Sequence, residues 1–184
     1  MDTPLTVDEQ QQLLHWARRA VEAAARGENL PEIPTAELTS GLLSLHAVFV
    51  TLTKAGELRG CIGPMDYERP LWRNALDAAK AAAMDDPRFP SVQPDEVPAL
   101  HLEVSVLDRP REIPNVSQFD PQHHGIIVEQ GWRSALLLPQ VAQEHGWDAA
   151  KTLETVCWKA GLPADAWREP GARLQVFEAF VFGE

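Results

Sequence analysis

The chain has 184 residues, a length that favours one domain, or one domain with an added lobe, over two large domains. Its 27 acidic side chains outnumber its 16 basic ones, and the net charge of −11 argues against nucleic acid or an anionic membrane surface as the main partner. The sequence contains neither a membrane-length apolar run nor a signal peptide, so we expect a cytoplasmic protein. The two cysteines, Cys61 and Cys157, match neither a disulfide framework nor a zinc spacing.

The first predicted element is a helix that begins after a capping box, in which Thr6 and Glu9 satisfy free backbone groups, and continues to Arg26. Apolar periodicity and turn residues then predict, in chain order, a hairpin of strands 47–53 and 58–62, a helix that begins at 70 and ends before 86–87, strands 100–108, 125–129 and 133–138, a short helix 139–146, a helix from 149 to 160, and a strand 174–182. Strands outnumber helices and occur as hairpins. We therefore expect an α+β fold with a mainly antiparallel sheet.

The densest cluster of unusual residues lies in the second strand of the predicted hairpin. The alternation of a strand places Arg59 and Cys61 on the same face, and a guanidinium beside a thiol favours the reactive thiolate. Gly60 and Gly63 predict a bulge, a bend, or close approach by a ligand or another backbone segment. Two interpretations stay open: nucleophilic or redox chemistry at the sulfur, or a small apolar cysteine in a core strand while the arginine pairs with a nearby carboxylate.

This hexapeptide, Leu58-Arg59-Gly60-Cys61-Ile62-Gly63, resembles the hallmark motif of the AMMECR family. The resemblance extends from about Leu13 to Phe182 through the segments FVTL (49–52), DPRFP (86–90), LEVSVL (102–107), HGI (124–126), LLLPQVA (136–142) and KAGLP (159–163). It implies one α+β domain over residues 1–184, with a larger antiparallel-sheet lobe flanked by helices, a smaller lobe, and the hexapeptide near the groove between them. It also implies a role in the AmmeMemoRadiSam system, beside Memo-like and radical-SAM proteins, but no defined reaction.

Further candidate residues lie on the strand 100–108, where His101, Glu103 and Ser105 alternate with apolar residues. If this strand neighbours the one carrying Cys61, Glu103 would pair with Arg59, and a histidine could accept a proton from the thiol. The alternative is a solvated sheet face with incidental charges.

Two other residues are candidates for binding a substrate. Arg88 could bind a carboxylate or phosphate, or it could pair with a nearby carboxylate at the end of a helix. His124 matches the family's His-Gly position, but no further ligand lies at helical spacing, so we predict no metal site. We expect Cys157 in the core, and most of the six tryptophans in packing positions rather than on a base-stacking platform.

Three functions remain open at this point. The first is an enzyme or enzyme subunit acting on a small molecule, for which the candidate catalytic residues are Cys61, Arg59 and Glu103 and the candidate substrate-binding residues are Gly60, Gly63, Arg88 and His124. The second is a non-catalytic scaffold for the Memo-like and radical-SAM partners. The third is a nucleic-acid-binding regulator, which the negative charge opposes. Nothing in the sequence predicts a cofactor.

Overall fold

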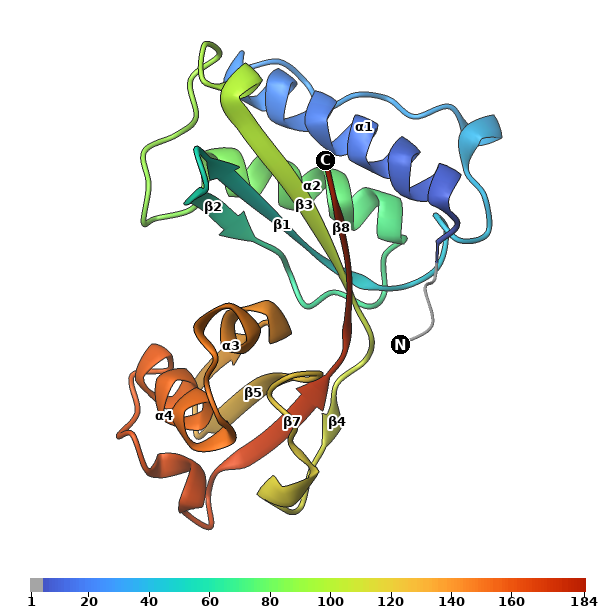
Figure 1. Cartoon of the computed structure of the whole chain (residues 1–184). Helices are drawn as coiled ribbons and strands as arrows, with labels where there is room; N and C mark the ends of the chain where they lie inside the picture. Colours follow the sequence, from blue (N-terminus) through green and yellow to red (C-terminus); the bar gives the residue numbers. More distant parts are fainter. Residues whose placement is uncertain (1–4) are drawn as a thin grey trace. The chain divides into compact units, whose positions relative to one another are not determined.

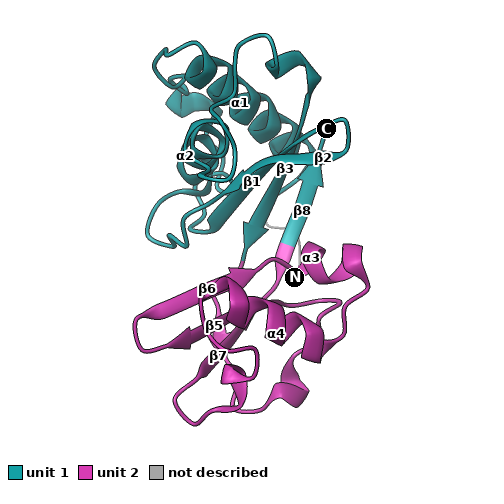
Figure 2. Ribbon diagram, turned by 90° about the vertical axis from the view of Figure 1, so that its left-hand side faces the viewer, with its two compact units in different colours: residues 1–107, 180–184 teal, residues 108–179 magenta. Residues whose placement is uncertain are grey.

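The computed structural model describes residues 5–184 (Figure 1). The chain forms two compact units, one made of Met1–Leu107 and Phe180–Glu184 and the other of Asp108–Ala179 (Figure 2). Each unit contains a four-stranded antiparallel sheet and two α-helices, which confirms the predicted α+β class. Within residues 5–184, no helix has the length and apolar character needed to cross a membrane.

In the first unit, the strands follow the order β2-β1-β3-β8, and both helices pack against one face of the sheet (Figure 2). The elements are α1 (Val7–Ala25), β1 (Ala47–Lys54), β2 (Glu57–Ile62), α2 (Leu71–Met84), β3 (Leu100–Leu107) and β8 (Ala179–Gly183). The predicted capping box begins α1, because the Thr6 hydroxyl accepts from the Glu9 amide and the Glu9 carboxylate accepts from the Thr6 amide. The predicted hairpin and second helix are confirmed as well.

Alternation along the central strands determines which face of this sheet is covered by the helices. Val48, Val50 and Leu52 of β1 are fully buried in the same core as the apolar stripes of α1 and α2. The intervening side chains, including Thr51, therefore lie on the face opposite the helices.

In the second unit, the strands follow the order β4-β7-β5-β6. The elements are β4 (Arg111–Glu112), β5 (Gly125–Gln130), β6 (Arg133–Leu137), α3 (Pro139–His145), α4 (Ala149–Lys159) and β7 (Arg173–Phe177). Asp148 caps α4 by accepting from the Lys151 amide at 2.8 Å. Cys157 is fully buried, as predicted, and burial raises the pKa of its thiol. The two-residue strand β4 had no signal in the sequence.

The predicted single strand 174–182 is wrong, because the structure divides it into β7 and β8 in different sheets. The division falls at Glu178, whose amide donates to Asp108 Oδ1 at 2.7 Å. β7 pairs with β5, whereas β8 runs antiparallel to β3, with the Glu184 amide donating to the Leu102 carbonyl. Period-two alternation continues across the junction, so it could not reveal that the partner strand changes.

Candidate functional site

The side chains of Cys61, Thr51 and Glu103 form a row across the first sheet. Thr51 of β1 is paired with Cys61 of β2 on one side and with Glu103 of β3 on the other. All three lie on the face opposite the helices, since Thr51 alternates with the buried Val50 and Leu52. The Thr51 hydroxyl donates to Cys61 Sγ at 3.3 Å. Because β1 separates β2 from β3, the two strands are not neighbours, and the condition on which Glu103 would pair with Arg59 is not met.

The backbone of Cys61 is held by two side chains from the segment after α2. β2 is an edge strand, and the outward-facing backbone groups of an edge strand need partners. The Cys61 amide donates to Asp86 Oδ2 at 2.9 Å, and the Cys61 carbonyl accepts from Arg88 Nη2 at 3.3 Å. We call this pair, Asp86 and Arg88, the edge clamp. It supplies the acceptor and the donor that a neighbouring strand would supply, and so fixes the position of Cys61.

The edge clamp is itself a bidentate ion pair. Arg88 Nε donates to Asp86 Oδ1 at 2.9 Å and Nη2 donates to Oδ2 at 2.7 Å. This hydrogen bonding lowers the pKa of the buried Asp86 carboxyl to about 2. The same bonds raise the pKa of Arg88, with a smaller contribution from the nearby Cys61 sulfur. The Arg88 side chain is 51% exposed, so the guanidinium that holds the Cys61 carbonyl also reaches solvent.

Arg59 pairs with a carboxylate, as the second interpretation of the hexapeptide expected, but the partner is not Glu103. Its Nη2 and Nε donate to the Glu96 carboxylate at 3.0 and 3.4 Å, so Glu96 takes the place expected for Glu103. Hydrogen bonds from Arg59 and Lys54 lower the pKa of Glu96 to about 2. Arg59 is thus part of an ion-pair cluster with Glu96 and Lys54, whereas Arg88 is the arginine that contacts the backbone of Cys61.

A β-bulge explains why strand alternation failed for Arg59. Gly60 is paired with Leu52, but Leu58 is paired with the next residue, Thr53. Arg59 is therefore the extra residue of the hairpin, and a bulge redirects its side chain. Within the described part of the chain, its buried Nη1 atom has no hydrogen-bond partner.

The two glycines of the hexapeptide make room for protein backbone. A Cβ atom on Gly60 would lie 2.1 Å from the carbonyl oxygen of Ala82 in α2. A Cβ atom on Gly63 would lie 2.2 Å from the carbonyl oxygen of Val48 in β1. Of the expectations for these glycines, close approach by another backbone segment accounts for both.

His124 lies in the second unit, immediately before β5. Its Nδ1 accepts from the Asp120 amide at 3.1 Å, and this bond ties the ring to its own loop. The following residue, Gly125, lies under the ring of Phe177: a Cβ atom on Gly125 would be 2.2 Å from Cζ of that ring. The described residues contain no group of three or more His, Cys, Asp or Glu side chains that could hold a metal ion. His124 and Cys61 belong to different units.

Two exposed tryptophans were not anticipated. Trp132, in the turn between β5 and β6, is 87% exposed, and Trp158, near the end of α4, is 57% exposed. A cation lies over each ring: Arg133 is 5.2 Å from the centroid of Trp132, and Lys151 is 4.9 Å from that of Trp158. Alternation and helical periodicity identify apolar faces, but they do not identify apolar side chains left in solvent.

Comparison with known proteins places the chain in a family. The AMMECR1 family model matches residues 14–182. A protein of Methanothermobacter thermautotrophicus is 43% identical over 98% of this chain and 97% of its own length. Protein MK0488 of Methanopyrus kandleri is 43% identical over the whole chain and 92% of its own length. The crystal structure of the uncharacterized protein PH0010 from Pyrococcus horikoshii matches with a TM-score of 0.93 and 37% identity, covering 98% of this chain and 94% of that one. The chain therefore belongs to the AMMECR1 family.

Proposed function

We propose that the protein is an enzyme, or a subunit of one, that acts on a small anionic molecule at the sheet face carrying Cys61. The observation that supports this proposal is the half-exposed Arg88 guanidinium, which donates to the backbone carbonyl of Cys61 and so helps to fix the residue that carries the thiol. Cys61 would be the nucleophile or redox thiol. Arg88 would attract the anionic group and orient it next to the sulfur.

The hydrogen bonds of Arg88 leave room for such a ligand. Nε and Nη2 bind Asp86 and the Cys61 carbonyl, and no bond to Nη1 is found within residues 5–184. A carboxylate or phosphate bound at Nη1 would lie near Cys61. Thr51, which donates to the sulfur, would keep the thiol oriented along the sheet face.

Alkylation kinetics test this proposal within one protein, because the chain has only two cysteines. Iodoacetamide should modify Cys61 faster in the folded protein than in the urea-denatured protein, while the buried Cys157 should react only after denaturation. The enzyme proposal fails if folding does not accelerate the reaction of Cys61.

The role of Arg88 is tested by comparing a neutral and an anionic reagent. Arg88→Gln should lower the ratio of the iodoacetate rate to the iodoacetamide rate, because only iodoacetate carries a charge that Arg88 attracts. The neutral reagent corrects for any movement of β2. Arg73→Gln, which removes an exposed arginine of α2, should leave the ratio unchanged. An unchanged ratio in Arg88→Gln contradicts the assigned role.

The second candidate function is a binding module for Memo-like and radical-SAM proteins, the partners that the family resemblance suggests. The exposed Trp132 and Trp158 favour it, since tryptophan and arginine are enriched among residues that dominate binding energy. Arg133, next to Trp132, also contacts the segment that follows the helix of Trp158, because its Nη1 donates to the Gly161 carbonyl just after α4.

Co-purification with the purified partners separates the two candidates. If the protein is a scaffold, the complex should persist in Cys61→Ala without loss of the pathway product, and it should weaken in Trp132→Ala. If Cys61→Ala abolishes product formation while the complex persists, the enzyme proposal is favoured. If the protein binds neither the Memo-like nor the radical-SAM partner, the scaffold function is contradicted.

A further inference from the structure

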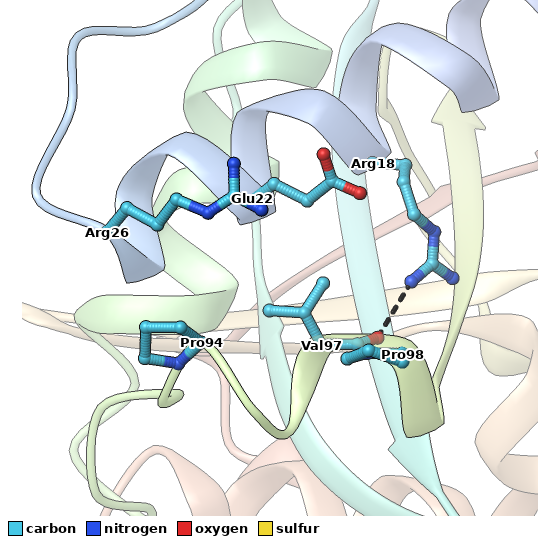
Figure 3. Close-up of a pocket in the computed structure, with 6 residues that line it drawn as sticks. All are labelled: Arg18, Glu22, Arg26, Pro94, Val97 and Pro98. Carbon is cyan, nitrogen blue, oxygen red and sulfur yellow. Dashed lines mark hydrogen bonds between the residues drawn. The ribbon is translucent and has the colours of Figure 1, made fainter.

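A pocket of about 340 Å³ lies in the first unit between α1 and the segment that precedes β3 (Figure 3). It is separate from the edge clamp and from the Cys61 side chain. Its lining residues are Arg18, Glu22, Arg26, Pro94, Val97 and Pro98. Pockets for small ligands span roughly 300–1,000 Å³, so this pocket suits a ligand at the small end of that range.

Arg18 forms a fixed wall of the pocket. Its Nη1 donates to the Val97 carbonyl at 3.0 Å and its Nη2 donates to the Leu100 carbonyl at 2.8 Å. The same guanidinium forms an ion pair with the Glu184 side chain, to which its Nε donates at 2.7 Å. Glu184 and two backbone carbonyls already accept hydrogen bonds from all three nitrogens of the Arg18 guanidinium, so this arginine holds one wall of the pocket in place and offers little to a second anion.

The two remaining charged residues are held less tightly, although the Glu22 carboxylate interacts through space with the Arg18 guanidinium. Glu22 and Arg26 follow Arg18 at intervals of four residues, which places the three on one side of α1 about 6 Å apart along its axis (Figure 3). Neither Glu22 nor Arg26 makes a side-chain hydrogen bond or ion pair within the described residues. The pocket therefore offers one carboxylate and one guanidinium side by side.

The opposite side of the pocket is apolar. Pro94, Val97 and Pro98 lie across from α1 in Figure 3, and the Val97 side chain is itself buried. An apolar group of a ligand would be removed from water against these residues. The pocket thus combines the Arg26 guanidinium, the Glu22 carboxylate and an apolar wall.

We infer that this pocket binds a small zwitterion with a short apolar side chain, the class to which aliphatic α-amino acids belong. The ligand carboxylate pairs with Arg26, the ammonium pairs with Glu22, and the side chain lies against Pro94, Val97 and Pro98. A simple carboxylate fits less well, because the Glu22 carboxylate would repel it. This site does not depend on the reaction proposed for Cys61.

Isothermal titration with three probes tests the charge pattern. L-Leucine carries both charges, 4-methylpentanoate lacks the ammonium group, and 3-methylbutylamine lacks the carboxylate. For a ligand of this size we expect L-leucine to bind with a Kd of about 1 mM, and each analogue to bind about tenfold more weakly. Failure of L-leucine to bind at tenfold this concentration overturns the inference, as does equal binding of 4-methylpentanoate.

Variants of α1 test the location of the site. Glu22→Gln and Arg26→Gln should each weaken L-leucine binding by about tenfold. Arg19→Gln is the matched control, because Arg19 is an exposed arginine of the same helix outside the pocket. It should leave the affinity unchanged. Circular dichroism verifies that all three variants fold. Equal weakening in Arg19→Gln and Arg26→Gln would place binding elsewhere and refute the assignment.

Discussion

Replacing Gly60 by alanine should destabilise the first unit, because one added methyl group meets protein backbone. The new Cβ atom would lie 2.1 Å from the Ala82 carbonyl oxygen, whereas a carbon–oxygen contact needs about 3.3 Å. The difference, about 1.2 Å, has to come from separating β2 and α2, since no side chain can rotate away. Overpacking of this kind costs about 1–3 kcal/mol, and two backbone segments should place the cost near 3 kcal/mol.

Urea unfolding measured by circular dichroism and tryptophan fluorescence gives the size of this effect. The matched control is Gly171→Ala, because no atom lies within 4 Å of the added Cβ position and the backbone there is not left-handed. This control should be neutral or stabilise the protein by up to about 1 kcal/mol, through the lower entropy of the unfolded chain. A Gly60→Ala variant that unfolds at the wild-type urea concentration refutes the close-approach argument.

Three further experiments probe the two ion-pair clusters and the contact between Gly125 and Phe177. Asp86→Asn should lower the free energy of unfolding by about 2 kcal/mol at neutral pH. The difference in stability from wild type should disappear as the pH falls from about 4 toward 2, because a carboxyl group with a lowered pKa stabilises the fold only above that range. A stability difference that does not change with pH in urea titrations contradicts this. Glu96→Gln should lower the stability by roughly 1–3 kcal/mol, because it leaves the mostly buried Arg59 without its ion pair. Lys54→Met should cost less than about 1 kcal/mol, because Lys54 is largely exposed. Equal losses in thermal unfolding would contradict this difference in burial. Gly125→Ala should lower the stability by about 1–3 kcal/mol, because the added methyl group displaces the Phe177 ring. Adding Phe177→Leu should restore part of that loss. The predicted contact is wrong if the loss in the double variant equals the sum of the losses in the two single variants.

Elements whose signal is local could be predicted from the sequence. The capping box at Thr6 and Glu9 concerns a few neighbouring residues, and it is present as expected. The N-cap at Asp148 is equally local. The division of the last predicted strand at Glu178 depends on which distant strand each half meets. Hydrophobic alternation indicates which face of a strand is buried but not which strand is its partner, so the prediction of a single strand over 174–182 failed.

The same distinction separates the predicted from the unpredicted parts of the candidate site. The hexapeptide identified Cys61, and the alternative interpretation of Arg88, pairing with a nearby carboxylate, is what the structure contains. The partner of Arg59 could not be predicted, because Glu96 lies 37 residues away in a segment without periodicity. Likewise, Gly60 signalled an irregular strand, but only the structure identifies the bulge that redirects Arg59.

The connectivity of the two units has a consequence for how the chain assembles during synthesis. All strands of the second unit lie within Asp108–Ala179, so that unit has its complete sheet available before the first unit does. The first unit receives its fourth strand, β8, only after the whole second unit has been made. Until then the outer edge of β3 exposes unpaired backbone groups to other chains. A nascent chain that stalls within the second unit is therefore the form most exposed to aggregation through β3, and the late pairing of β8 ends that exposure.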